Sequence, residues 1–304
     1  MNKIPVIIDV DTGTDDAVAI AEACYLNRLD VKLISCGSGN TDVQNVVTNT
    51  LNILQLINKG DILVAKGEGK KFKPNKFFLN VHGKTGMGEY NFEPLRIKEI
   101  AQPAEDAIIE VIQNSAQKIV IIGLGPLSNI ARALDKNPQI ATNIDRIVIS
   151  GGLIEKLDDG QFPYTSFNIA YDDEAVKLLL SSGIKIEIVP SNLGHDAYLT
   201  YEEVYKTKTA NTTGMCFEKI FRTYHDRHVK NGIAMHDSCA VFYVAHPELF
   251  KKESAFSCVK NEGANNEGII KFDFLTNSPN TTVVTNINIP KFKKLYFKTL
   301  KKMP

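Results

Sequence analysis

Residues Ile4–Asp16 read I-P-V-I-I-D-V-D-T-G-T-D-D, a short apolar run followed by four carboxylates within eight residues. Val6, Ile7 and Ile8 are consecutive β-branched residues, a pattern typical of a strand buried on both faces of a parallel sheet. Gly13 permits a tight turn, and the apolar residues after it have helical spacing. The stretch therefore predicts an interior strand, a turn and a helix, with the carboxylates converging at the turn.

The four acidic residues of this turn are Asp9, Asp11, Asp15 and Asp16. Anions this close repel one another, and a pair at ~4 Å costs on the order of several kcal/mol at a low effective dielectric constant. We therefore expect a cation among them. Hard oxygen ligands without a neighbouring Cys or His favour Ca²⁺ or Mg²⁺ over zinc. A site at the end of this strand also agrees with the rule that open α/β sheets bind ligands outside the carboxyl ends of their strands.

The rest of the chain continues the alternation of strands and helices. Apolar runs indicate strands near residues 31–36, 62–65, 119–122, 144–149 and 185–189, and helical spacing indicates helices near 41–58, 103–115 and 201–230. Pro126 is expected to begin a helix, because proline suits a first helical position, and His195 is expected in a turn. Strands near 256–259, 268–274 and 282–289 and a basic final helix complete the prediction of one α/β domain over residues 1–304.

Composition limits the partners. The 304 residues carry a formal net charge of zero, and basic residues form no long block before the carboxyl end, so nucleic acid is not an expected partner and a small neutral molecule is. The five cysteines are far apart and lack C-x-x-C spacing, which predicts reduced thiols and a cytoplasmic location. No apolar run reaches membrane-spanning length, and no secretory signal is evident, so no membrane partner is expected.

The segment D-V-D-T-G-T-D-D-A at Asp9–Ala17 resembles the amino-terminal signature D-x-D-P-G-x-D-D-A of the nucleoside hydrolases of the inosine-uridine preferring type, with Thr12 in place of the proline. Further segments resemble this family in its own order as far as Phe250, among them V-H-G-K-T-G-M-G, G-P-L-S-N and H-D-S-C-A. The resemblance implies a single open, mostly parallel Rossmann-like sheet flanked by helices, the nucleoside hydrolase fold. It also implies a Ca²⁺-dependent hydrolysis of nucleosides and a homodimer or homotetramer.

The resemblance assigns roles around the metal. It implies that Asp11, Asp16, Asp237 and the backbone carbonyl of Leu124 hold Ca²⁺, with Asp9 as a supporting ligand. Asp11 is then expected to be the general base that activates a metal-bound water. His236 is expected to protonate the leaving base, because an imidazole can give up a proton near neutral pH. Tyr224 and His225 are weaker candidates for that proton donor.

The resemblance also assigns contacts to the substrate. The implied residues are Asp15, which would accept the ribose 2′-hydroxyl, together with Asn40, His82, Ser166, Asn168 and Tyr224. Ser166 stands where the family has a glutamate, and Gly160 aligns with a family asparagine. Losing a charged hydrogen bond of roughly 1.5 to 3 kcal/mol could weaken sugar binding by about tenfold to a hundredfold. Either Ser166, Tyr164 or Gln161 compensates, or the substrate is a 5′-modified or deoxy nucleoside.

Two other functions remain open on the sequence. A Mg²⁺-dependent phosphohydrolase with Asp9 as nucleophile would also use a first strand that ends in D-x-D, although Gly13 stands where the haloacid dehalogenase-like phosphatases have Thr or Val. A nucleoside- or ribose-binding protein that keeps the metal but has lost or altered activity would account for Ser166 and Gly160.

Overall fold

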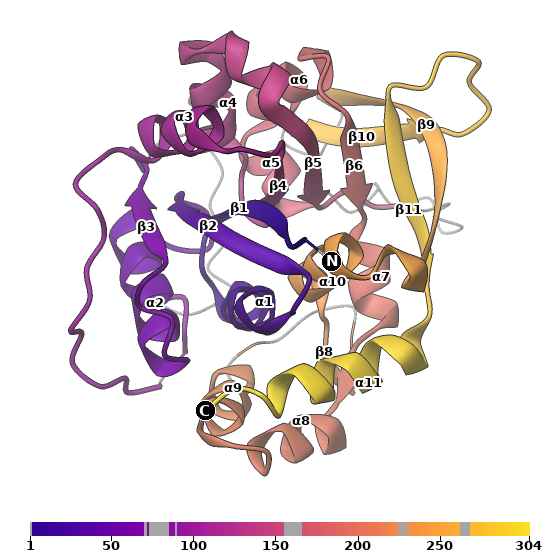
Figure 1. Ribbon diagram of the computed structural model, residues 1–304. Helices are drawn as coiled ribbons and strands as arrows, with labels where there is room; N and C mark the ends of the chain where they lie inside the picture. The colour runs from indigo at the N-terminus through magenta and orange to yellow at the C-terminus, as the bar shows by residue number, and fades with distance from the viewer. Residues whose placement is uncertain are drawn as a thin grey trace.

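The computed structural model describes residues 2–69, 72, 85–88, 90–154, 166–222, 224, 229, 231–261 and 268–304. Within them, nine strands form one sheet in the order β10-β9-β11-β6-β5-β4-β1-β2-β3 (Figure 1). These strands are β1 (Ile4–Val10), β2 (Leu29–Cys36), β3 (Leu63–Lys66), β4 (Ile119–Gly123), β5 (Ile144–Ser150), β6 (Ile186–Val189), β9 (Phe250–Asn261), β10 (Gly268–Asp273) and β11 (Thr281–Ile287). The short strands β7 (Leu199–Thr200) and β8 (Gly232–Ile233) form a separate antiparallel pair.

The sheet is parallel from β3 to β11 and antiparallel only where β9 joins β11 and β10. The predicted open, mostly parallel sheet is therefore confirmed. Because the strands between β3 and β6 run the same way, their carboxyl ends share one edge, the edge at which such sheets bind ligands.

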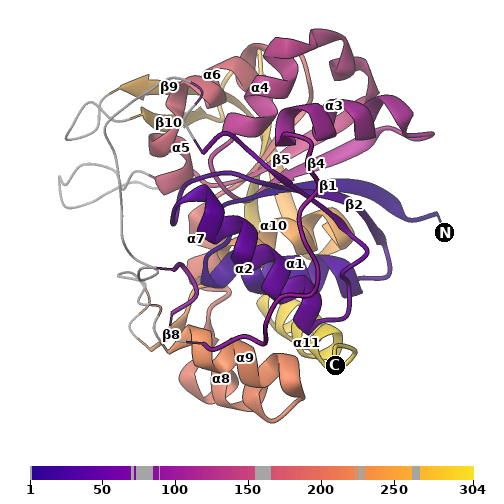
Figure 2. The same cartoon turned by 90° about the vertical axis from the view of Figure 1, so that its left-hand side faces the viewer.

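Helices cover both faces of the sheet (Figures 1 and 2). One buried apolar cluster includes residues of α1 (Thr14–Tyr25), α2 (Val43–Leu56), α7 (Ser191–Asp196), α8 (Tyr201–Lys208), α9 (Thr212–Phe221), α10 (His236–Ala245) and α11 (Ile289–Leu300). A second cluster includes residues of α3 (Ala104–Asn114), α4 (Ser128–Lys136), α5 (Phe167–Tyr171), α6 (Asp173–Ser181) and the 3-10 helix η1 (Pro138–Asn143). A second short 3-10 helix, η2 (Pro247–Leu249), leads into β9. In Figure 1, α3, α4 and α6 lie above the strands and α1, α9 and α11 below them.

Strand β1 supplies side chains to both cores, as its sequence predicts. Val6, Ile8 and Val10 belong to the cluster that contains α1, whereas Ile7 belongs to the cluster that contains α3 and α4. Side chains alternate between the two faces of a strand, and each of these residues is almost fully buried. The interior position of β1, between β2 and β4, fixes the start of the acidic turn at the ligand-binding edge.

Two local predictions are wrong. Pro126 precedes α4, which begins at Ser128, because the chain is still completing a turn in which the N–H groups of Leu124 and Gly125 donate to the Asp9 carbonyl (2.8 and 3.3 Å). His195 lies in the last turn of α7 and not in an irregular turn, because a helix begins directly after Pro190 and extends to Asp196.

No helix of the described segments is both long enough and apolar enough to span a bilayer.

Replacing Ile7 with alanine should lower the free energy of unfolding by about 2–5 kcal/mol, because this fully buried side chain fills the space between β1 and the helices α3 and α4. Urea unfolding followed by circular dichroism measures this value. Leu275→Ala is the control, because Leu275 is 94% exposed and its loss should change stability by no more than about 0.5 kcal/mol. Equal effects of the two substitutions would contradict the interior position of β1.

Candidate functional site

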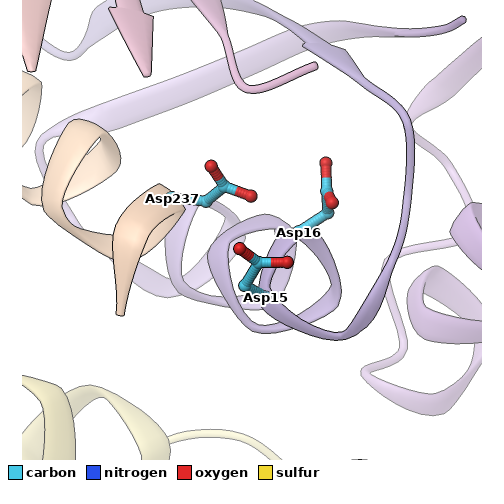
Figure 3. Close-up of side chains that lie close together, drawn as sticks. All are labelled: Asp15, Asp16 and Asp237. Atoms are coloured by element: carbon cyan, nitrogen blue, oxygen red, sulfur yellow. The ribbon is translucent and has the colours of Figure 1, made fainter. Parts of the chain in front are cut away.

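Three carboxylates meet at the carboxyl edge of the sheet. Asp15 and Asp16 lie in the first turn of α1, and Asp237 lies in the first turn of α10. Each offers one oxygen to a group in which all these oxygens lie within 4.8 Å of one another. Figure 3 shows the three side chains approaching one another from the two helices. Residues far apart in the sequence thus form one acidic cluster.

Burial and repulsion raise the pKa of Asp16 and of Asp237. Burial raises the pKa of Asp16 to about 7, and the charge of Asp15 adds to the rise. Burial also raises the pKa of Asp237 well above its usual range, and Asp15, Asp16 and Asp11 contribute repulsion. The buried Oδ1 of Asp15 has no hydrogen-bond partner within the described part of the chain. A group of oxygen ligands that repel one another and keep an unpartnered oxygen suits a hard divalent cation.

Asn40, which follows β2, links Asp11 to this cluster. Its backbone N–H donates to Asp11 Oδ2 (2.7 Å), and its side-chain Nδ2 donates to Asp16 Oδ2 (3.2 Å). The backbone N–H of Asp11 donates to Asp16 Oδ1 (3.3 Å), and that of Gly13 donates to Asp16 Oδ2 (3.0 Å). Asp11 is fully buried, and its pKa is raised well above the usual range by burial and by the charge of Asp16. The carboxylate of Asp11 therefore borders the three-carboxylate cluster, and its role as a metal ligand stays a prediction.

Two glycines leave room for the Asp11 carboxylate. A Cβ atom at Gly39 would lie 2.1 Å from Asp11 Oδ2, and a Cβ atom at Gly125 would lie 2.7 Å from Asp11 Oδ1. Neither distance is compatible with a side chain, so the two backbones confine the carboxylate from both sides. This confinement restricts Asp11 to the orientation in which it faces Asn40 and α1.

Asp9 does not join the cluster, so the prediction that all four carboxylates converge is wrong for this residue. Ser35 Oγ (2.5 Å) and Asn129 Nδ2 (2.9 Å) both donate to Asp9 Oδ1. Burial raises the pKa of Asp9 to about 7. Asp9 shares the face of β1 on which Ile7 packs in the cluster that contains α4, the helix that carries Asn129. Asp11 instead lies beyond the end of β1 at Val10, in the turn that leads to α1.

The carbonyl of Leu124, a predicted metal ligand, accepts a hydrogen bond from Asn168 Nδ2. The same Nδ2 donates to the Ser150 carbonyl (3.2 Å), and Ser150 Oγ donates to Asp237 Oδ1 (2.9 Å). Asn168, Leu124 and Asp237 are thereby connected through the end of β5. The structure therefore brings these three predicted site residues together. Asn168 bonds directly to the Leu124 carbonyl, and Ser150 links Asn168 to Asp237.

The remaining predicted residues lie in different surroundings. Ser166 is buried directly before α5. Tyr224 is 8% exposed and packs in the apolar cluster with Phe217 and Phe221, so its contact with a nucleobase stays a prediction. His236 is the first residue of α10, next to Asp237. The predicted residues outside the described part of the chain are His82, Gly160, Gln161, Tyr164 and His225.

Sequence reasoning missed the polar residues that hold the acidic ones. Ser35 could have been found from strand pairing, since it is the register partner of Asp9 in the parallel pair β1–β2. Asn129 carried a weaker signal as the last residue of the G-P-L-S-N segment. Asn49 of α2 carried none, yet its Nδ2 donates to the carbonyls of Thr12 (2.9 Å) and Thr85 (2.6 Å) and so ties the acidic turn to residues 85–88.

Comparisons with known proteins agree on one family. The model of the family described as inosine-uridine preferring nucleoside hydrolase matches residues 6–294. The chain is 33% identical over 297 residues to the non-specific ribonucleoside hydrolase RihC of Klebsiella pneumoniae, covering 96% of each protein. The RihC protein of Salmonella typhimurium matches with the same identity and coverage. A solved structure, the purine-preferring ribonucleoside hydrolase from Gardnerella vaginalis, superposes with a TM-score of 0.89 at 25% identity and 98% coverage of both chains.

The raised pKa values predict how stability depends on pH without a metal. Asp16 keeps its proton to about pH 7 in the folded state but loses it near 3.8 when unfolded. Between these values the unfolded state binds fewer protons, so the free energy of unfolding should fall as pH rises, on the order of a few kcal/mol. Urea unfolding in a chelator at pH 5 to 8 measures the slope.

Two additions to that experiment test its cause. Ca²⁺ should restore stability more at pH 8 than at pH 5, because protons and cation compete for the same oxygens. Asp16→Asn should flatten the slope in the chelator. Stability that rises with pH in the chelator would contradict the described cluster.

Proposed function

Because the chain belongs to the inosine-uridine preferring nucleoside hydrolases, a family of N-glycosyl hydrolases, we propose that it cleaves ribonucleosides to free base and ribose in a Ca²⁺-dependent reaction. The observation that supports calcium dependence is the cluster of Asp15, Asp16 and Asp237, of which the last two are buried. We also keep the predictions of a homodimer or homotetramer and of a cytoplasmic location.

The proposed metal ligands are Asp16 and Asp237 together with Asp11 and the Leu124 carbonyl, and Asp15 lies within the same cluster. Ca²⁺ fits better than Mg²⁺, since it accepts six to eight oxygen ligands in flexible geometry and needs no regular octahedron. When bound, the cation would neutralise the mutual repulsion of the carboxylates and make a neighbouring water easier to deprotonate. The donor set is all oxygen, which disfavours zinc.

Asp11 is the proposed general base. Nucleoside cleavage passes through a state in which the sugar ring carries positive charge, so nearby carboxylates lower its energy. Asp11 would take a proton from the water that attacks the anomeric carbon. The Asn40 N–H and the backbones of Gly39 and Gly125 would hold the carboxylate in place during this step.

His236 is the proposed donor of the proton that the leaving base needs. Asp15 and Asn168 are the proposed partners of the ribose hydroxyls. Because Asn168 Nδ2 is engaged with the carbonyls of Leu124 and Ser150, Oδ1 is the atom that would accept a hydroxyl. Ser166 directly precedes α5, the helix that carries Asn168, and stands where the family has a glutamate.

The alternative of a phosphohydrolase with Asp9 as nucleophile finds no support. Asp9 lies outside the group formed by Asp15, Asp16 and Asp237, and its Oδ1 already accepts hydrogen bonds from Ser35 and Asn129. The alternative of a binding protein without turnover is decided by the activity measurement that follows.

Asp11→Asn should reduce kcat for inosine and uridine by about a hundredfold to ten-thousandfold, because the amide cannot accept the proton of the attacking water. A chelator should abolish the release of reducing sugar from both nucleosides, and added Ca²⁺ should restore it. Asp30→Asn is the control, since Asp30 is a partly exposed residue that pairs with Lys32. Nucleoside binding with no sugar release from the wild type would identify a binding protein.

The 5′-hydroxyl of the sugar should contribute little to binding, because Ser166 cannot supply the charged acceptor of a glutamate. We expect kcat/KM for 5′-deoxyuridine within about threefold of that for uridine, and Ser166→Glu should favour uridine by about tenfold or more. Ser166→Ala is the control and should leave the ratio unchanged. A wild type that prefers uridine tenfold, with the preference lost in Ser166→Ala, would show instead that the serine hydroxyl compensates.

A further inference from the structure

Helix α7 lies against the first residue of α10. The rings of His195 and His236 are 4.8 Å apart between centroids, with an angle of 78° between their planes. This edge-to-face arrangement is one of those that aromatic rings prefer, since the positive edge of one ring meets the negative face of the other. Sequence reasoning gave His195 no role, and neither the metal nor the sugar contacts proposed above use it.

The backbone of α7 confines the same histidine. A Cβ atom at Gly194 would lie 2.3 Å from His236 Nδ1 and 2.7 Å from His236 Cα, so glycine is required for this close approach. The Gly194 carbonyl accepts a hydrogen bond from the Met235 N–H (3.1 Å), the residue before His236. His236 therefore contacts the backbone of Gly194 and the ring of His195.

Helix α7 is itself fixed to the edge of the sheet. The Ser191 N–H donates to the Gly152 carbonyl (2.9 Å). Asn192 and Ile154 exchange two hydrogen bonds: the Ile154 N–H donates to Asn192 Oδ1 (2.7 Å), and Asn192 Nδ2 donates to the Ile154 carbonyl (2.8 Å). Leu193 is buried in the core beneath α7. These contacts fix α7, and with it the ring of His195, relative to the edge of the sheet.

We propose that His195 is a positioning residue that holds the His236 imidazole in the orientation from which it protonates the departing nucleobase. This inference rests on the proposed function of His236. In the step concerned, the C1′–N bond breaks and its electron pair goes to the base nitrogen. Water oxygen forms the new C1′–O bond, Asp11 takes the proton of that water, and His236 gives a proton to the base. A displaced imidazole would weaken only the last transfer.

The leaving group separates this role from a general effect on the fold. A purine or pyrimidine anion is a poor leaving group and needs a proton, whereas nitrophenolate is stable as an anion and does not. The test compares kcat for inosine and for 4-nitrophenyl riboside in the Ca²⁺-loaded wild type and in the variants His195→Ala, His195→Phe and His236→Ala. His246→Ala is the matched control, because His246 follows the other end of α10 and pairs with Glu248 (3.0 Å).

We expect His195→Ala to lower kcat for inosine by about tenfold to a hundredfold and to leave kcat for 4-nitrophenyl riboside within about twofold of wild type. His195→Phe should regain most of the inosine activity, since it keeps an aromatic edge against His236. His236→Ala should show the same pattern with a larger inosine loss. His246→Ala should change neither rate.

Each other outcome overturns a defined part. Equal losses on the two substrates in His195→Ala, or no loss on inosine, would refute the positioning role while a selective loss in His236→Ala keeps the proposed function. No selective loss in His236→Ala would refute the role of His236 and the inference with it. Failure of His195→Phe to recover activity would refute the ring contact as the cause.

Discussion

The repulsion among buried carboxylates is the constraint on which the rest of this structure depends. Asp16 and Asp237 are buried and Asp15 lies beside them, and its charge adds to the burial that makes these two carboxyl groups harder to ionise. Both helices present their amino-terminal turns, where the unpaired N–H groups favour negative charge. The helix ends therefore stabilise the ionised carboxylates but do not cancel the repulsion between them. A protein that keeps such an arrangement needs a cation or protons to complete it.

Within the described part of the chain, amides, hydroxyls and backbone N–H groups donate hydrogen bonds to the acidic side chains. Asn40 bonds to Asp11 and Asp16 at once, and Ser150 bonds to Asp237. These neutral donors orient the acidic oxygens but do not neutralise their charge. A salt bridge would do both. A lysine or arginine in their place would compete with a cation for the same oxygens. The glycine backbones that flank Asp11 and His236 add a steric limit that no hydrogen bond supplies.

The local part of this design could be predicted from the sequence. Strand β1, the glycine turn and α1 follow from periodicity within one short stretch, and the parallel sheet follows from repeated apolar runs. The pairing of Asp237 with that stretch came only from the family resemblance, because periodicity carries no information on contacts between distant residues. Asp9 was misplaced since its orientation depends on which helix covers its face of the sheet. The contact of His195 with His236 depends likewise on the packing of α7 against α10.

The two halves of the acidic cluster come from opposite parts of the chain, and this affects how the protein folds. Asp15 and Asp16 lie in the first helix, α1, whereas Asp237 lies in α10. Most strands of the sheet lie between these two helices in the sequence. Closing so long a loop is slow and entropically costly. During synthesis the early aspartates therefore remain hydrated, and the three-carboxylate cluster forms only once α10 has packed beside α1. A cation that binds this cluster would stabilise only those forms in which α10 is in place. It would therefore lower the population of the partly folded forms.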